Sequence, residues 1–147
     1  PVLDSISLRT LDHEPIVRTP KASLLTRYPT GRGTLTVVNV HAMNFVPLAK
    51  FARQIAQVHE LVAAENGPLL IGGDFNTWNP SRVRLVMSTM EKAGLERVPV
   101  TTPRRWRHLG QQLDHVFTRG MKLIEARPLV HVVSSDHIPL RMEFAWE

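Results

Sequence analysis

Residues 34–40 read TLTVVNV and run directly into His41. Apolar and β-branched side chains fill nearly every position, whereas a strand with one solvated face alternates apolar and polar residues. This pattern is typical of a strand that is covered on both faces. Residues 34–40 therefore predict an interior strand, and the segments on either side of it indicate the fold class.

The sequence that follows alternates helix and strand. Residues 47–66 carry an apolar stripe at helical spacing, begin at Pro47 and end before a Gly-Pro pair, which predicts an amphipathic helix. Residues 69–71 predict a short buried strand. Asn79–Pro80 opens a second helix that stops at Gly94. Strand, crossover helix, strand and helix in this order predict an α/β layer.

Further strands are predicted on both sides of this unit. Each is a short apolar or β-branched stretch bounded by turn residues. The predicted strands are residues 6–11, 22–28, 113–118, 126–133 and 140–144. Residues 99–112 contain two prolines and show no periodicity, so they predict a loop.

Composition limits the class of protein. A chain of 147 residues with 43% apolar residues fits one globular domain. No run of 18 apolar residues and no basic-then-apolar leader occurs, so the sequence shows neither a membrane span nor a signal peptide. The lack of cysteine excludes disulfides, thiolate metal sites and a cysteine nucleophile, and it favours a cytoplasmic location.

The net charge is +5, and fourteen of the eighteen basic residues are arginine. Arginine makes forked contacts with phosphate groups, so this excess is compatible with a phosphate-bearing partner such as a nucleic acid. A charge of this size is also common on proteins that bind no polyanion. Charge alone therefore does not decide the function.

Polar clusters lie where the predicted strands meet loops. Only five aspartates occur, and three of them, Asp74, Asp114 and Asp136, lie in short polar clusters next to apolar segments. A fourth cluster, Asn39 to His41, ends the interior strand. Ligands of α/β sheets bind at such strand ends, so we expect a functional site here.

The residue types in these clusters suit metal-assisted phosphoryl chemistry. Asp and Asn supply oxygen ligands for Mg²⁺ or Mn²⁺, a carboxylate can hold a water in line, and imidazole transfers protons near neutral pH. The sequence contains no serine-hydrolase elbow, P-loop or H-E-x-x-H motif. Metal-assisted hydrolysis is therefore the chemistry that the residues favour.

The residues of these clusters and their order along the chain resemble those of a known family. They read N-V-H at 39–41, G-D-F-N at 73–76, L-D-H-V-F at 113–117 and S-D-H-I-P-L at 135–140. Together they resemble the endonuclease/exonuclease/phosphatase superfamily, and the likeness covers most of residues 19–144. The nearest likeness is to uncharacterised bacterial members with a T-P-K-x-A-L-like segment, here residues 19–24, and a tryptophan after G-D-F-N.

The resemblance implies a role for each matching residue. Asp74 matches the carboxylate that orients or activates the attacking water, and Asn76 matches the amide that contacts the scissile phosphate or the metal shell. His137 matches the histidine beside the phosphate. Asp114 matches the carboxylate that fixes the tautomer of that histidine.

Two further matches concern the metal and the leaving group. Asp136 matches a position that contributes to the metal environment. His41 matches the histidine that polarises phosphate or protonates the leaving oxygen in members related to pancreatic deoxyribonuclease and sphingomyelinases. Abasic-site nucleases carry tyrosine there, so His41 argues against that activity.

Substrate contacts are predicted around these clusters. Asn39, Trp78 and the basic-aromatic segment with Arg104, Arg105 and Arg107 are the candidates. For Trp78, packing under its own loop is an equal alternative, and a solvated loop is the alternative for the three arginines. Arg82 at the start of the second helix either faces an anionic substrate or lies on an exposed helix surface.

The resemblance also implies a larger fold. The family domain is a four-layered α/β/β/α sandwich nearly twice this length, with an upstream asparagine and a glutamate that is the main Mg²⁺ ligand. Neither motif is present, and the surroundings of Glu14 do not resemble the glutamate motif. Residues 1–147 are therefore interpreted as the C-terminal half of the domain, with a mixed sheet and helices on one face, and we expect the start at Pro1 to reflect processing or excision.

Such a half would leave the second sheet face bare, with Val37, Val40, Leu70 and Val116 as candidates to line it. We expect the missing N-terminal half or a second copy of the chain to cover that face. The predicted function is divalent-metal-dependent, nuclease-like hydrolysis of a phosphodiester, with the isolated fragment inactive. The alternatives are a phospholipid or inositol-phosphate hydrolase of the same fold and a non-catalytic phosphate-binding module.

Overall fold

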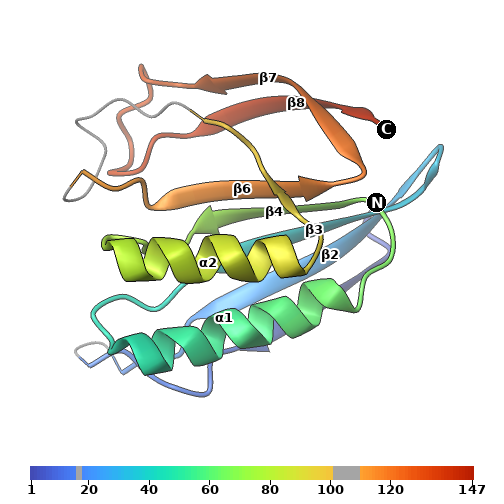
Figure 1. The fold of residues 1–147 in the computed structure, drawn as a ribbon. Helices are drawn as coiled ribbons and strands as arrows, with labels where there is room; N and C mark the ends of the chain where they lie inside the picture. The colour runs from blue at the N-terminus through green and yellow to red at the C-terminus, as the bar shows by residue number, and fades with distance from the viewer. Residues whose placement is uncertain (16–17, 101–109) are drawn as a thin grey trace.

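The computed structural model describes residues 1–15, 18–100 and 110–147 (Figure 1). In chain order, the strands and helices are β1 (Asp4–Arg9), β2 (Ala22–Thr30), β3 (Gly33–His41), α1 (Leu48–Ala63), β4 (Leu69–Asp74), α2 (Pro80–Lys92), β5 (Glu96–Arg97), β6 (Asp114–Arg119), β7 (Met121–Pro128) and β8 (Leu140–Trp146). Six strands form a sheet in the order β1-β2-β3-β4-β6-β5, and β7 pairs with β8.

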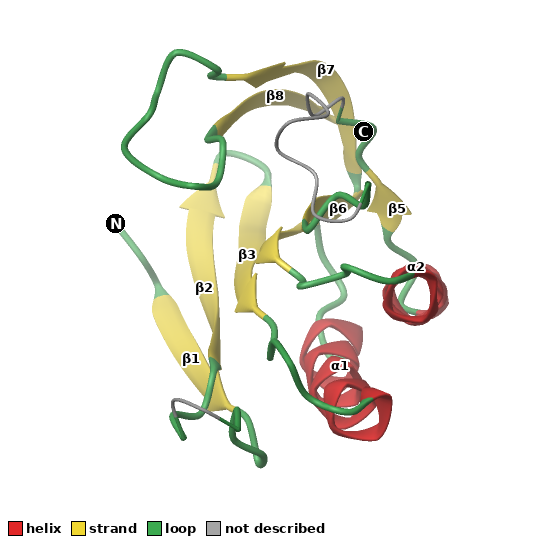
Figure 2. Cartoon of the chain, turned by 90° about the vertical axis from the view of Figure 1, so that its left-hand side faces the viewer, coloured by secondary structure: helices red, strands yellow, loops and turns green. Residues whose placement is uncertain are grey.

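The predicted interior strand lies inside this sheet. β3 pairs antiparallel with β2 and parallel with β4, and α1 makes the crossover between the two parallel strands. Both helices cover the same face of the sheet (Figure 2). The prediction of an α/β fold with a mixed sheet and helices on one face is confirmed, whereas the four-layered arrangement stays a prediction.

The core lies between the helices and this face. α1 turns Phe51, Ile55, Val58 and Val62 inward, as its apolar stripe predicts. Asn79 caps α2 by accepting a hydrogen bond from the Arg82 backbone N–H at 2.9 Å. Neither α1 nor α2, the two helices in the part of the chain that the structure describes, has the length and apolar run of a membrane span.

The opposite face carries the predicted row of apolar side chains with one exception. Val37, Leu70 and Val116 lie there and are half-buried. The prediction for Val40 is wrong because this side chain is 1% exposed and packs in the helix-covered core. Side chains alternate along a strand, so Val37 and Val40, three residues apart, point to opposite faces.

The end of the chain differs from the predicted pattern. The strand predicted at residues 126–133 lies earlier, in β7, which begins after the turn at Gly120 and pairs with β8 from Met121 to Pro128. Residues 129–139 form the connecting loop, and this loop carries the S-D-H motif. β5 is a two-residue edge strand that the sequence did not predict.

Candidate active site

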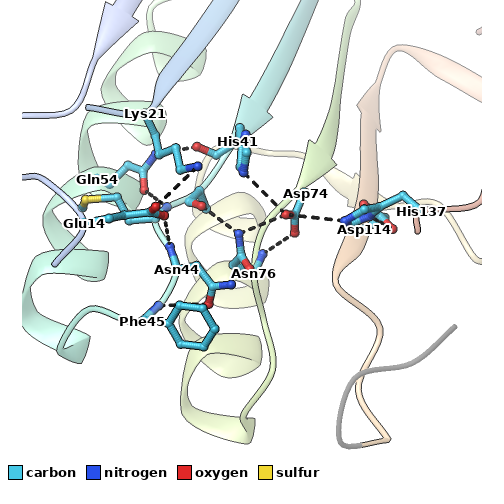
Figure 3. Close-up of polar contacts among 12 residues, drawn as sticks. Glu14, Lys21, His41, Asn44, Phe45, Gln54, Asp74, Asn76, Asp114 and His137 are labelled. Atoms are coloured by element: carbon cyan, nitrogen blue, oxygen red, sulfur yellow. Dashed lines mark hydrogen bonds and ion pairs between the residues drawn. The ribbon is translucent and has the colours of Figure 1, made fainter. Parts of the chain in front are cut away.

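The sheet register brings three of the predicted polar clusters into one row. His41, the last residue of β3, pairs with Asp74, the last residue of β4, and Asp74 pairs with Asp114, the first residue of β6. Paired residues in neighbouring strands project from the same face. The three side chains therefore lie side by side where the ends of β3 and β4 meet the start of β6 (Figure 3).

Asp74 lies between two imidazoles. Its Oδ2 is 3.8 Å from His41 Nε2 and 4.0 Å from His137 Nε2. Both separations exceed hydrogen-bonding distance, so a water or a substrate oxygen can bridge either pair. The carboxylate thus faces a space in which two histidines can contact the same small ligand.

Asn76 fixes the position of this carboxylate. Its backbone N–H donates to Asp74 Oδ1 at 2.8 Å, and its side-chain NH₂ donates to Asp74 Oδ2 at 3.0 Å and to the Ala42 carbonyl at 2.8 Å. Asn76 is 2% exposed and has a φ of 48°. Both amide protons are used within the protein, so Asn76 positions Asp74 in this structure, and its contact with phosphate or metal stays a prediction.

His137 reaches the row from the β7–β8 loop. Its Nδ1 lies 2.9 Å from each carboxylate oxygen of Asp114, which directs Nε2 toward Asp74. Burial lowers the pKa of His137, but the hydrogen bond and charge of Asp114, helped by Asp74 and Asp136, raise the pKa above its ordinary value. The pair therefore favours a charged imidazolium with a fixed orientation.

Burial also acts on the partner carboxylate. It raises the pKa of Asp114, and the neighbouring charges of Asp74 and Asp136 add to this effect. Pairing with His137 lowers the pKa of Asp114 but does not cancel the effect of burial. The cluster concentrates negative charge in a partly desolvated place, which favours a bound cation or protonated histidine.

The positions of the other predicted site residues do not assign them a role. Asn39 is exposed on the same sheet face as His41, and Asp136 is exposed beside His137. The half-buried Trp78 packs against Arg82, whose Cζ lies 4.8 Å from the ring centroid. Arg104, Arg105 and Arg107 lie outside the described residues. Substrate or metal contacts of these residues stay predictions.

Arg82 has a role that the sequence did not predict. It is 1% exposed and lies under the site, where Nη1 donates to the carbonyls of Met43 and Asn76 and Nη2 donates to the carbonyl of Val46. Its guanidinium also lies 4.2 Å from the Phe51 ring centroid. Burial lowers its pKa to about 10. Arg82 thus ties the loop after β3 to the loop after β4.

A sequence signal for this role exists. Arg82 lies four and eight residues before Val86 and Met90, which are buried on the inner face of α2. A charged residue at a position on the apolar stripe of a helix is expected to be buried, and a buried charge requires polar partners. The same spacing argument applies to Gln54 on the inner face of α1.

We predict that Arg82→Met lowers the free energy of unfolding by about 3 kcal/mol or more, because three buried carbonyls lose their donor. Arg84→Met is the matched control, since Arg84 lies two residues further along α2 and is exposed. Among the described residues, its side chain bonds only the Ser81 hydroxyl, at 3.3 Å. Urea unfolding of both variants measures the difference. Equal stabilities of the two variants would contradict the structural role of Arg82.

His115 packs on the helix side of β6, because it follows Asp114 in the strand and successive side chains point to opposite faces. It is buried beside Phe75 and Phe117, and its Nε2 lies 2.7 Å from the Thr77 hydroxyl. The hydroxyl donates to the Gln112 carbonyl, so it accepts from Nε2–H of the neutral ring. Burial, followed by the charge of Arg97, lowers the pKa of His115 to about 4.

This shift predicts a loss of stability in acid. The unfolded chain protonates His115 near pH 6.5, whereas the folded protein resists protonation until about pH 4. The stabilisation is therefore complete above pH 6.5 and is lost as the pH falls toward 4, by about 3 kcal/mol in all. Unfolding free energies of the wild type and His115→Leu at pH 7 and pH 4 test this, since an equal fall in both would contradict it.

A cavity of about 210 Å³ adjoins the cluster. His41, Asp74 and Asn76 line one side of it, and Glu14 and Lys21 line the other. Glu14 is buried, accepts a hydrogen bond from the Asn44 backbone N–H at 2.6 Å and lies 3.5 Å from Lys21 Nζ. A larger cavity of about 450 Å³ beside α2 and β5 contains none of the predicted catalytic residues.

The described residues do not complete a metal site. Within residues 1–15, 18–100 and 110–147, no three Asp, Glu or His side chains are grouped closely enough to hold a metal ion. Both oxygens of Asp74 accept hydrogen bonds from Asn76, and both oxygens of Asp114 face His137. A Mg²⁺ ion requires better-placed oxygen ligands than this cluster supplies by itself.

The sequence is similar to those of known proteins. The sequence profile of the endonuclease/exonuclease/phosphatase family matches residues 3–137. A UPF0294 protein of Yersinia enterocolitica is 40% identical over 135 residues, which are 90% of this chain and 52% of the relative. A UPF0294 protein of Erwinia tasmaniensis is 37% identical over 135 residues, which are 90% of this chain and 50% of the relative. The chain spans about half the length of the curated relatives it matches.

Solved structures show the same fold at low identity. An endonuclease/exonuclease/phosphatase from Beutenbergia cavernae has a TM-score of 0.74 and 16% identity over 99% of this chain and 45% of its own. The catalytic domain of human Nocturnin with bound sulfate has a TM-score of 0.67 and 16% identity over 100% of this chain and 60% of its own. A mannosyl-6-phosphatase of Bacteroides thetaiotaomicron has a TM-score of 0.68 and 16% identity over 99% and 67%.

Proposed function

Because this chain belongs to the endonuclease/exonuclease/phosphatase family, as its motifs predicted, we propose that it carries the acid and histidine residues of an active site that hydrolyses a phosphodiester. Members of the family are phosphoesterases and nucleases. The observation that carries the proposal is the position of Asp74 between two histidines, one of which is oriented by Asp114. That constellation fits direct attack of water on phosphorus.

Each residue has a proposed task in this reaction. Asp74 orients the attacking water and accepts its proton. His137, held with Nε2 toward Asp74, places positive charge against the non-bridging phosphate oxygens, where negative charge develops. His41, the most exposed of the three, protonates the leaving oxygen. Asp114 fixes the tautomer and the orientation of His137.

Divalent cations are generally used by enzymes of this family. We propose that the full-length protein uses Mg²⁺ or Mn²⁺, with the main carboxylate ligand supplied from outside residues 1–147 and Asp136 near the ion. Such an ion would supply charge neutralisation at the phosphate. The isolated chain is then expected to be inactive, because the described residues supply only part of a metal site.

The open sheet face supports a proposal about partners. Val37, Leu70 and Val116 are half-buried there, and Leu24 is exposed beside them. We propose that the N-terminal half of the family domain or a second copy of the chain covers this face. Light scattering of the isolated chain tests whether a second copy covers this face, because a stable monodisperse 16.6 kDa monomer would contradict that form of the proposal.

The substrate is proposed to be a nucleic acid or another nucleotide phosphodiester. A phospholipid or inositol phosphate is the alternative within the same chemistry, and a binding module is the alternative without it. The His137–Asp114 pair argues against a pure binding module, since phosphate binding alone does not require a fixed histidine tautomer. A cytoplasmic location stays part of the proposal.

One experiment separates these alternatives. The full-length protein is assayed with Mg²⁺ or Mn²⁺ on plasmid DNA, RNA, sphingomyelin and bis-p-nitrophenyl phosphate, with EDTA-treated samples as controls. We expect metal-dependent cleavage of the nucleic acids and of the model diester. Cleavage of sphingomyelin alone would favour the lipid hydrolase, and phosphate binding without cleavage of any substrate would favour the binding module.

A further inference from the structure

Phe45 is presented to solvent in an unfavourable backbone conformation. It lies in the loop between β3 and α1, four residues after His41, and its side chain is 65% exposed. Its φ of 50° lies in the left-handed region, which bulky residues other than glycine rarely adopt. Strain of this kind persists only where the surroundings impose it, and it is concentrated at functional sites.

Three consecutive backbone N–H groups are held by side-chain oxygens. Met43 N–H donates to Gln54 Oε1 at 2.7 Å, and Asn44 N–H donates to Glu14 Oε1 at 2.6 Å. Phe45 N–H then donates to the side-chain oxygen of Asn44 at 2.9 Å. The acceptors come from α1, from the segment after β1 and from the loop itself.

The carbonyl groups of the same loop are held from below. Arg82 donates to the carbonyls of Met43 and Val46 at 2.9 and 2.8 Å. The backbone on both sides of Phe45 is therefore fixed by buried partners, although the ring itself is exposed. A loop that is held this firmly can present an aromatic ring without losing conformational freedom when a ligand binds.

Phe45 lines the cavity of about 210 Å³ that adjoins the proposed reacting groups. Phe45, Glu14 and Lys21 line it together with His41 and Asp74. In Figure 3, Phe45 and Asn44 lie on the side of the cluster away from His137. A substrate whose phosphate lies between His41 and His137 would therefore place one of its two ester groups beside Phe45.

The lining determines which chemical group fits. The flat ring of Phe45 suits a planar group, and the ammonium of Lys21 suits phosphate. Glu14 and the side chain of Asn44 offer polar atoms to the edge of a ring. An acyl chain in this cavity would cover the polar groups of Glu14, Lys21, His41 and Asp74 without offering them a hydrogen bond, which is unfavourable.

We propose that this cavity is the subsite for the nucleoside next to the scissile phosphate, with Phe45 stacking on its base and Lys21 contacting a phosphate. The inference rests on the proposed function and adds a substrate class and a specificity-determining residue to it. It also gives the T-P-K segment at residues 19–21 a task, because Lys21 lines the cavity. Base–aromatic stacking is tolerant of sequence, so the subsite selects nucleotides without selecting one base.

The test is equilibrium binding to the full-length protein, measured by calorimetry without turnover. The probes are thymidine 5′-monophosphate and 2-deoxyribose 5-phosphate, in which a hydroxyl replaces the thymine at C1. We expect the nucleotide to bind about 10-fold more tightly, as one stacking contact predicts. Phe45→Ala should remove this preference and leave the affinity for the sugar phosphate unchanged, whereas Phe45→Tyr should keep the preference.

Leu48→Ala is the matched control, because Leu48 is 46% exposed three residues further along the chain and does not line the cavity. It should leave both affinities unchanged. Equal binding of the two probes by the wild type would overturn the proposal. A fall in Tm with equal weakening of both probes in Phe45→Ala would also overturn it, because the ring would then only pack against other parts of the protein.

Two further outcomes separate this inference from the proposed function. If Phe45→Ala selectively weakened binding of a hexanoyl lysophosphatidic acid and not of thymidine 5′-monophosphate, the subsite would hold an acyl chain and the proposal would fall. If the base preference depends on Phe45 but no diester is hydrolysed, the nucleoside subsite stands and the proposed reaction falls. If a diester is hydrolysed without any base preference, the proposed reaction stands and the nucleoside subsite falls.

Discussion

We expect Asp74→Asn and His137→Ala each to lower the rate of the proposed phosphodiester hydrolysis by the full-length protein by about 10³-fold, which is the size of a lost general base or phosphate contact. Asn keeps the shape of Asp74 but cannot accept the proton of the attacking water. Loss of the His137 ring removes the positive charge beside Asp74. Asp74 ends β4 and His137 lies in the β7–β8 loop, both outside the hydrophobic core, so we expect the variants to fold.

Rates measured on bis-p-nitrophenyl phosphate with Mg²⁺ or Mn²⁺ test this prediction, together with the Tm of each variant. Asp4→Asn and His131→Ala are the matched controls, because both residues are exposed and outside the cluster. The controls should retain activity within a few-fold of the wild type. Activity within a few-fold of the wild type for Asp74→Asn or His137→Ala would contradict the assigned roles.

We expect Gly73→Ala to lower the free energy of unfolding by at least about 4 kcal/mol or to prevent cooperative folding. A Cβ atom on Gly73 would lie 2.0 Å from the Val40 carbonyl oxygen, and its φ of 144° disfavours any side chain. The clashing atom belongs to the backbone of the neighbouring strand, which pairs with Gly73. Relief of the clash therefore requires β3 and β4 to separate where His41 meets Asp74.

Urea unfolding and the yield of folded protein measure this effect. Gly31→Ala is the control, since no heavy atom lies within 4 Å of its added Cβ and its φ is not positive. The control should differ from the wild type by less than about 1 kcal/mol. A Gly73→Ala variant as stable as Gly31→Ala would show that the strands are not paired as described.

The elements with strong local signals were predictable. The dense β-branched pattern of residues 34–40 identified the interior strand, and the 3.6-residue stripe identified α1 within three residues at each end. The motifs identified the family because they are short and depend on sequence order alone. The edge strand β5 and the start of β7 were not found, since their pairing partners lie far away in the chain and local propensity is weak.

The arrangement of the site was only partly predictable. Strand ends indicated that Asp74 and His41 are functional candidates, but the register that aligns them with Asp114 depends on pairing between distant strands. The burial of Arg82 and the strained position of Phe45 depend on tertiary contacts from α1, α2 and Glu14. Glu14 lacks the family's glutamate motif, so only the structure places it beside the cavity.

The stereochemical course at phosphorus tests the proposed attack by water most directly. A single in-line displacement by water inverts the configuration, whereas a covalent intermediate on His41 or His137 requires two displacements and retains it. The measurement is hydrolysis of a chiral phosphorothioate diester by the full-length protein in ¹⁸O-labelled water. Inversion is the predicted result, and retention would contradict the role of Asp74 as the residue that directs water onto phosphorus.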